Sequence, residues 1–148
     1  MNCFFCTDQD AENKIDQSEY WNIYLSNNQT YLGRCLIALK RHASDLAELE
    51  KVEWQDFINL VERIEKSMTR SFEPTLFNWA CLMNNAYQEI IPNPHVHWHL
   101  VPRYSHVVEF DGEIFEDLEF GHHYNSQKSK NIPPNLRQIL ISRIKKNL

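Results

Sequence analysis

Glycine is scarce in this sequence, and long apolar runs are missing from it. Only three of the 148 residues are glycine, which excludes collagen-like chains and Gly-rich linkers. No apolar run approaches the roughly 20 residues that cross a bilayer, so we expect no membrane partner. The first residues also lack the basic start and apolar stretch of a signal peptide. The sequence therefore predicts a cytoplasmic protein.

Basic residues are outnumbered by acidic ones. Fifteen Lys and Arg stand against twenty Asp and Glu, a net charge of −5, whereas a nucleic-acid binder usually shows a basic footprint. We therefore expect no nucleic-acid partner. Residues 128–148 nevertheless carry six basic and no acidic residues, and residues 109–119 carry six acidic and no basic ones. Two interpretations fit: a basic C-terminal helix docked on an acidic face of the same or a second subunit, or a solvated helix.

The four cysteines do not indicate a disulfide framework, because no secretion signal accompanies them. Cys3 and Cys6 form a C-x-x-C pair, whereas Cys35 and Cys81 lie in apolar runs and are interpreted as small buried hydrophobes. The length and the 43% hydrophobic content fit one globular domain over residues 1–148.

Apolar patterning predicts an α+β fold. β-branched and aromatic runs predict strands at 20–25, 33–40, 76–83, 95–101 and 107–110. Apolar residues at helical spacing predict a helix of about 25 residues that begins near Ser44, with an interruption near Glu53 left open. A short helix is expected around 136–144. An antiparallel sheet covered by the long helix accounts for this order.

Three histidines alternate with apolar residues in the segment 95–101. Side chains of a strand alternate between faces, so His95, His97 and His99 share one face. The residues between them turn to the other face, into a core. Histidines pack poorly side by side because each needs polar partners. The pattern indicates either a metal site or a catalytic face.

Spacing separates the roles of the three histidines. His95 and His99 are about 13 Å apart along an extended strand, so all three cannot easily reach one tetrahedral zinc. At least one histidine needs another role, and the central one is the candidate. A neutral His97 can serve as a nucleophile, and flanking groups can stabilise charge on a phosphoryl group.

The pattern of alternating histidines resembles that of the histidine triad (HIT) superfamily of nucleotide hydrolases and transferases. Further phrases fall in that family's order: Cys3-Phe4-Phe5-Cys6, the run 36–42 that ends in His42, Asn84, and the run 101–104. The resemblance covers residues 1–104 and is closest to bacterial zinc-containing members. Residues 105–148 match nothing in it; we expect this extension to contribute to a dimer interface or to the rim of the pocket.

The resemblance implies an antiparallel HIT-like fold, a homodimer, and a purine nucleoside phosphate bound across the sheet. His97 would attack the α-phosphorus of a nucleoside phosphoanhydride or phosphoramidate, such as a diadenosine polyphosphate or an AMP amidate. A nucleotidyl-histidine forms, and water releases a nucleoside monophosphate. His99 and Asn84 would contact phosphate oxygens, and His95 would orient the site. This chemistry requires no metal.

A structural zinc site is also implied. Cys3, Cys6, His42 and His95 match the order of ligands in many bacterial members, and thiolates with imidazoles suit zinc. Such a site has no open coordination position for catalysis.

The resemblance also places a nucleoside pocket near the N-terminal loop and the end of the first predicted strand. The base would be surrounded by Phe4, Phe5, Tyr24 and Leu25, and plain core packing is the alternative for each of these four. The ribose would be held by Ser26 and Asn27.

Two departures from the family leave the activity open. Ile90-Ile91-Pro92-Asn93-Pro94 stands where many members carry Gly-Gln-Ser/Thr-Val, so a leaving-group contact is missing unless Asn93 or Gln88 replaces it. Arg34 stands where a histidine is common; it can bind a distal phosphate or form a structural ion pair. A nucleotide-binding protein with little turnover, a nucleotidyl transferase and a metal-binding protein remain alternatives.

Overall fold

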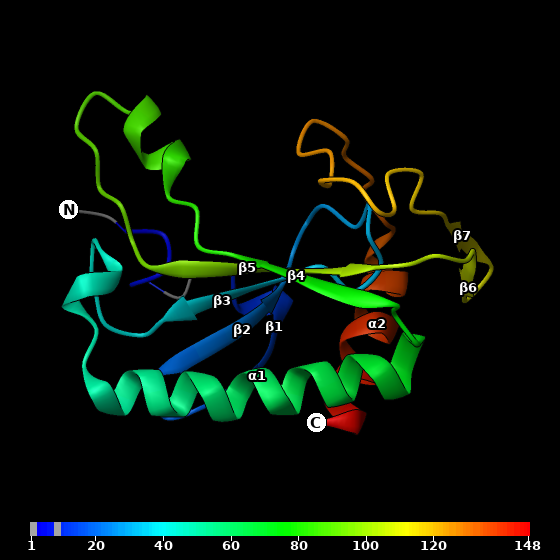
Figure 1. The fold of residues 1–148 in the computed structure, drawn as a ribbon, viewed down its shortest axis with the longest axis horizontal. Coiled ribbons are helices and arrows are strands. Elements are labelled where there is room, and N and C mark those ends of the chain that lie inside the picture. The colour runs from blue at the N-terminus through cyan, green and yellow to red at the C-terminus, as the bar shows by residue number, and fades with distance from the viewer. Residues whose placement is uncertain (1–2, 8–9) are drawn as a thin grey trace.

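The computed structural model of the protein describes residues 3–7 and 10–148. Five antiparallel strands form one sheet with the order β1-β2-β3-β5-β4, and a separate two-stranded ribbon lies beyond its end (Figure 1). The strands of the sheet are β1 (Lys14–Gln17), β2 (Trp21–Leu25), β3 (Cys35–Leu39), β4 (Leu76–Ala80) and β5 (His97–Arg103). The ribbon consists of β6 (Val108–Phe110) and β7 (Glu113–Phe115).

Within the described residues, two α-helices and three short 3-10 helices complete the fold. The long helix α1 (Lys51–Phe72) runs beneath the sheet, and α2 (Pro134–Asn147) packs beside it near the chain's C-terminus (Figure 1). The 3-10 helices are η1 (Ala11–Asn13), η2 (Leu46–Glu48) and η3 (Asn84–Gln88). The α+β prediction, with one long and one short helix, is confirmed. Within the described residues no helix is long and apolar enough to span a membrane.

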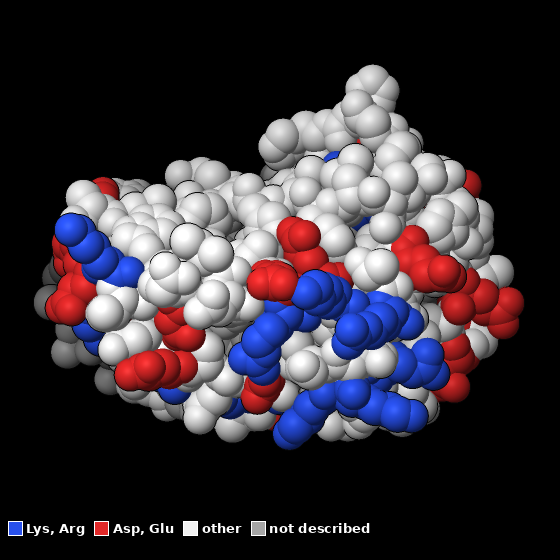
Figure 2. All heavy atoms as spheres, turned by 60° about the horizontal axis from the view of Figure 1, so that its bottom comes forward, with Lys and Arg blue, Asp and Glu red and all other residues white. Residues whose placement is uncertain are grey.

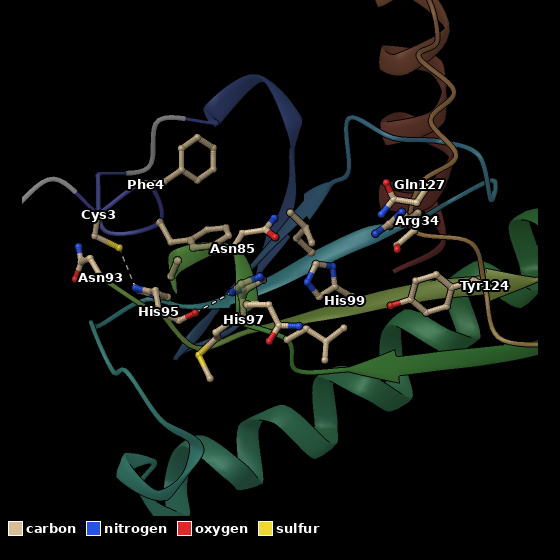
Figure 3. Close-up of a pocket in the computed structure, with 17 residues that line it drawn as sticks. Cys3, Phe4, Arg34, Asn85, Asn93, His95, His97, His99, Tyr124 and Gln127 are labelled. Carbon is tan, nitrogen blue, oxygen red and sulfur yellow. Dashed lines mark hydrogen bonds between the residues drawn. The ribbon is translucent and has the colours of Figure 1, made fainter. Parts of the chain in front are cut away.

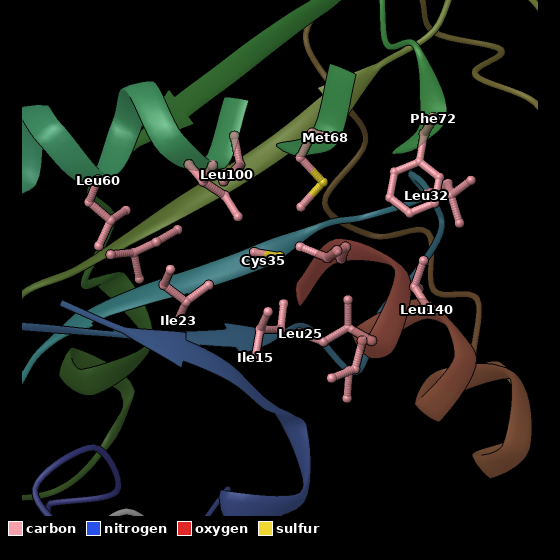
Figure 4. Packing of buried hydrophobic residues seen from close by; sticks show 14 of the residues in the cluster. Ile15, Ile23, Leu25, Leu32, Cys35, Leu60, Met68, Phe72, Leu100 and Leu140 are labelled. Atoms are coloured by element: carbon pink, nitrogen blue, oxygen red, sulfur yellow. The ribbon is translucent and has the colours of Figure 1, made fainter. Parts of the chain in front are cut away.

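The core lies between α1 and the sheet. Phe57, Leu60, Ile64, Met68 and Phe72 are buried on one face of α1, at the spacing that forms an apolar stripe along a helix. They pack against alternate residues of the strands, and α2 closes the far end of the same cluster (Figure 4).

The predicted long helix is divided in two, and the division precedes Glu53. Asp45 caps the short η2, where its carboxylate accepts a hydrogen bond from the Ala47 amide at 2.8 Å. Glu50 then caps α1 in a reciprocal arrangement, since its amide donates to the Glu53 carboxylate at 2.8 Å. Such a capping box satisfies donors that a helix start leaves free, so α1 begins at Lys51 rather than near Ser44.

Strand boundaries differ from the predictions by a few residues. The triad strand begins at His97, not His95. Residues 95 and 96 instead turn toward the segment after β3, where the Val96 amide donates to the Ala43 carbonyl at 2.8 Å. The short strands β1 and β7 were not predicted, because their polar residues carry little strand pattern and their pairing partners define them.

The extension after residue 104 is attached by a buried ion pair. Arg103 and Asp117 have side chains only 2% exposed, and the guanidinium donates two hydrogen bonds to the carboxylate at 2.6 and 3.0 Å. Arg103 also donates to Asn78 and to the His122 carbonyl, both at 2.9 Å, and lies over the Tyr31 ring. These contacts return the chain to the sheet just before Tyr124.

The basic and the acidic segments of the C-terminal region form ion pairs with each other within one chain. Lys128 pairs with Glu119, and Lys130 lies 3.4 Å from Glu113. The basic segment therefore docks on the acidic segment through the residues that precede α2. The α2 helix itself presents lysine and arginine side chains to solvent, and Figure 2 shows them gathered beside the acidic side chains.

We expect Asp117→Ala to destabilise the protein by about 3–5 kcal/mol, because it leaves the buried Arg103 charge without its partner. Urea denaturation followed by circular dichroism measures this. Glu62→Gln is the matched control, since it breaks an exposed pair with Lys66 and should change the midpoint very little. Equal effects of the two substitutions would contradict the structural role of the pair.

Candidate active site

A cavity of about 790 Å³ lies on the face of the sheet opposite α1 (Figure 3). Its floor is formed by side chains of β3 and β5 and by Arg34, which precedes β3. The N-terminal loop closes one end, and the extension reaches the other end with Tyr124, Ser126 and Gln127. The segment that follows β4 forms the remaining wall.

The side chains of β5 alternate between the two faces of the sheet, as predicted. His97 and His99 line the cavity. Trp98 turns to the opposite face and stacks on Phe57 of α1, with ring centroids 5.0 Å apart. Leu100 is fully buried in the same core. The strand thus carries the two histidines on a rigid, packed support.

His97 is held in one tautomer. Its Nδ1 lies 2.8 Å from the His95 carbonyl oxygen, which can only accept a hydrogen bond, so Nδ1 carries the proton and Nε2 keeps its lone pair. Burial lowers the pKa of His97, which keeps the ring neutral at pH 7. The Phe5 and His99 rings flank it, each with its centroid 4.9 Å away. The arrangement provides an oriented, unprotonated nitrogen in the cavity.

His99 is a half-buried neutral group next to the nucleophile candidate. Burial, with smaller contributions from His97 and Arg34, lowers the pKa of His99 to about 4. Its Nδ1 is covered and has no protein partner. A buried ring nitrogen without a hydrogen-bond partner is energetically costly.

Cys3, Cys6, His42 and His95 come together beside the cavity. Their four ligating atoms lie within 4.8 Å of one another. His95 Nδ1 is 3.2 Å from the Cys3 sulfur, 3.5 Å from the Cys6 sulfur and 3.3 Å from His42 Nδ1. Tetrahedral zinc with two thiolates and two imidazoles separates its ligands by about 3.3–3.8 Å. The cluster therefore has the composition and dimensions of a closed metal site.

A backbone contact orients His95 toward this cluster. Its Nε2 lies 2.7 Å from the Leu39 carbonyl oxygen, so Nε2 carries the proton and Nδ1 faces the other ligands. A hydrogen bond of this kind commonly orients metal-binding histidines. His95 thereby contributes its ring to the metal cluster and its carbonyl to His97.

The metal cluster also positions two aromatic rings. Phe4 and Phe5 lie between the two cysteines in sequence, and both line the cavity. The Phe5 ring contacts His95 and His97, whereas Phe4 is 50% exposed and meets Phe5 edge-on. The loop thus provides an apolar surface at one end of the cavity.

Four of the residues predicted to bind the nucleoside lie outside the cavity lining. Tyr24 is buried and contacts Phe5. Leu25 is fully buried in the core on the α1 side of the sheet, which is the alternative of core packing that the sequence left open. The backbone carbonyls of Ser26 and Asn27 face Arg137 of α2 at 3.4 Å, which ties this strand end to the C-terminal helix.

The segment between β4 and β5 contributes amides to the cavity. Asn84, predicted to contact phosphate, lines it together with Asn85 and Asn93. Gln88 is not among the described lining residues. Ile90 and Ile91 are exposed to solvent and are not among the lining residues.

Sequence reasoning missed the part of the cavity formed by Tyr124, Ser126 and Gln127. No local pattern marks these residues, since they follow a stretch that matches no motif. Tertiary contacts of Arg103 bring them to the sheet. The expectation that the extension reaches the pocket rim agrees with this position.

The family model of the HIT domain matches residues 7–106. The chain belongs to the HIT family. A search of curated proteins gave no match.

Solved HIT structures share the fold over nearly the whole chain. A hypothetical histidine triad nucleotide-binding protein from Sulfolobus tokodaii has a TM-score of 0.68 at 17% identity, covering 98% of this chain and 91% of its own. A Zn-bound family member from Mycobacterium smegmatis has a TM-score of 0.62 at 18% identity, with coverages of 99% and 95%. Diadenosine triphosphate hydrolase of Plasmodium falciparum has a TM-score of 0.62 at 16% identity, with coverages of 93% and 76%.

We expect the His99 ring to titrate near pH 4, because burial opposes its protonation. The shift is downward from the ordinary value of about 6.5, so the ring stays neutral throughout the neutral range. Long-range ¹H–¹⁵N NMR of the folded protein measures the midpoint, and His99→Gln identifies the resonance. A midpoint above about 6 would show a solvated ring instead.

Proposed function

We propose that this HIT protein is a nucleotide hydrolase that cleaves nucleoside phosphoanhydrides or phosphoramidates at the α-phosphate and releases a nucleoside monophosphate. The observation that carries the proposal is the His97 ring: Nδ1 bonds to the His95 carbonyl, and the ring lines the cavity. Such a nitrogen is suited to covalent catalysis, in which one difficult displacement becomes two easier ones.

His97 Nε2 attacks the α-phosphorus in the first step, and the bond from phosphorus to the leaving group breaks. The positive charge that develops on the ring is stabilised at Nδ1, whose proton already bonds to the His95 carbonyl. Water then attacks the phosphorus of the nucleotidyl-histidine and loses a proton to the solvent. The bond to Nε2 breaks, and the ring recovers its lone pair.

Neutral hydrogen-bond donors would contact the phosphate oxygens in this reaction. His99 and the side-chain amide of Asn84 line the cavity beside His97, and fixed donors of this kind stabilise charge in the transition state of phosphoryl transfer. The purine base is assigned to the apolar end, where the exposed Phe4 ring offers a surface for stacking.

The proposal includes a structural zinc ion held by Cys3, Cys6, His42 and His95. The distances between the ligating atoms support it. When bound, zinc would join the N-terminal loop to the segment before β5, and so keep Phe5 against His97. The predicted homodimer and cytoplasmic location stay predictions; β4 at the sheet edge offers unpaired backbone groups to a second copy.

We expect His97→Ala to lower turnover by about three orders of magnitude or more, as loss of a nucleophile does in covalent enzymes. Diadenosine tetraphosphate and adenosine 5′-phosphoramidate are incubated with each variant, and AMP is measured by chromatography. His97→Asn is a second variant, because it retains an N–H near Nδ1 and lacks Nε2. Nucleotide binding should survive in both.

His106→Ala is the control for this experiment, since His106 is exposed and lies outside the cavity lining. Residual turnover in His97→Asn close to wild type would sink the nucleophile assignment. Nucleotide binding without any turnover in wild type would identify a binding protein. Transfer of AMP to an added acceptor would identify a transferase.

We expect the purified protein to contain one equivalent of zinc by mass spectrometry, and Cys6→Ser to lose most of it. Removal of the metal should lower the melting temperature by roughly 10 °C, because linkage of about 4 kcal/mol is lost and each kcal/mol shifts a chain of this size by about 2–4 °C. Cys81→Ser removes a thiol outside the cluster and serves as the control. Zinc-free wild type that cannot be reconstituted would contradict the site.

A further inference from the structure

Arg34 is a half-buried cation at the end of the cavity that lies away from the metal cluster (Figure 3). Its Nε is covered and has no protein hydrogen-bond partner. Its guanidinium carbon lies 5.7 Å from the centroid of the Tyr124 ring. Among the described residues no carboxylate forms an ion pair with it. The structural ion pair, one of the two interpretations that the sequence left open, is therefore not found there.

Three other arginines of the chain form ion pairs with acids, among the residues that the structure describes. Arg41 pairs with Glu53, Arg63 with Asp16, and Arg103 with Asp117. Burial lowers the pKa of Arg34, and the described groups that favour its charge are the phenols of Tyr124 and Tyr31. A desolvated cation without a counter-ion is unfavourable. An anion entering the cavity from solvent would remove this penalty.

The position of Arg34 indicates which part of a ligand supplies the anion. His99 lies between His97 and Arg34 in the cavity (Figure 3), and its ring is close enough to both that they lower its pKa. Phe4 lies at the opposite end. A nucleotide with its base on Phe4 and its α-phosphate at His97 therefore directs its next substituent toward Arg34.

We propose that Arg34, with Tyr124 and Gln127 beside it, forms a subsite for an anionic leaving group, so that the substrates are phosphoanhydrides rather than phosphoramidates. This inference rests on the proposed function. It adds Tyr124 and Gln127, which lie outside the residues that the family model matches, and so gives the C-terminal extension a role in substrate choice.

The chemistry of the leaving group supports the same choice. In an anhydride the bond from the α-phosphorus to the bridging oxygen breaks, and the electron pair stays on that oxygen. The product is a phosphate anion that needs no proton to depart, and Arg34 compensates its charge. The amine of a phosphoramidate must instead be protonated as it leaves. No carboxylic acid occurs among the described lining residues, and His99 is neutral at pH 7.

The test compares kcat/KM for diadenosine tetraphosphate and adenosine 5′-phosphoramidate in wild type, Arg34→Gln and Arg63→Gln. We expect wild type to favour the anhydride. Arg34→Gln should lower the anhydride value about 10–100-fold, the range for loss of a charge-assisted hydrogen bond, and leave the phosphoramidate value within about twofold. Arg63→Gln removes the same charge from an exposed site and should change neither.

Two kinetic outcomes would overturn the subsite. Equal losses on both substrates in Arg34→Gln would show that Arg34 acts on the shared α-phosphate or on folding. A wild-type preference for the phosphoramidate would show that the anion is not required. Arg34→Lys keeps the charge and should recover part of the anhydride activity, which a purely steric role would not predict.

Binding measurements separate this inference from the proposed hydrolase activity. Calorimetry with AMP and ADP needs no turnover. The subsite predicts that wild type binds ADP about tenfold more tightly than AMP, since ADP adds one charge-assisted contact. Arg34→Gln should lose this difference, and Arg63→Gln should retain it. Equal affinity of wild type for AMP and ADP would refute the subsite, whereas a protein that binds selectively without turnover would refute only the hydrolase.

Discussion

The period-two alternation of β5 is the constraint on which the other features depend. β5 pairs with β3 on one side and with β4 on the other, so its residues cannot rotate without breaking two ladders. Trp98 and Leu100 pack in the core against α1. His97 and His99 must therefore face the cavity. The hydrophobic effect on one face of the strand thus orients the polar chemistry on the other.

Two carbonyl oxygens then determine which nitrogen of each histidine is available. The Leu39 carbonyl accepts a hydrogen bond from His95 Nε2, so that His95 Nδ1 faces the cysteines. The His95 carbonyl accepts a hydrogen bond from His97 Nδ1, which leaves His97 Nε2 free. One residue therefore links the metal cluster to the nucleophile candidate through its side chain and its backbone. Phe5, carried on the loop between the two cysteines, makes a second link.

The charges of Arg103 and Arg34 are compensated differently. Arg103 is almost fully buried and satisfied by Asp117, and its contacts attach the C-terminal extension to the sheet. Arg34 has no carboxylate partner within the described part of the chain, and it faces the cavity that this extension completes. A satisfied buried ion pair builds the site, whereas an unsatisfied cation is available for a ligand.

Local patterns in the sequence were sufficient for the alternating histidines, the apolar stripe of α1 and the Cys3-Cys6 pair, because side-chain period and short spacing depend on neighbours along the chain. The start of α1 was misplaced, since a capping box competes with helix continuation there. The orientation of Leu25 toward the core depends on strand pairing. The position of Tyr124 beside Arg34 depends on the Arg103 contacts. Those contacts join residues that are distant in sequence, and no local pattern encodes them.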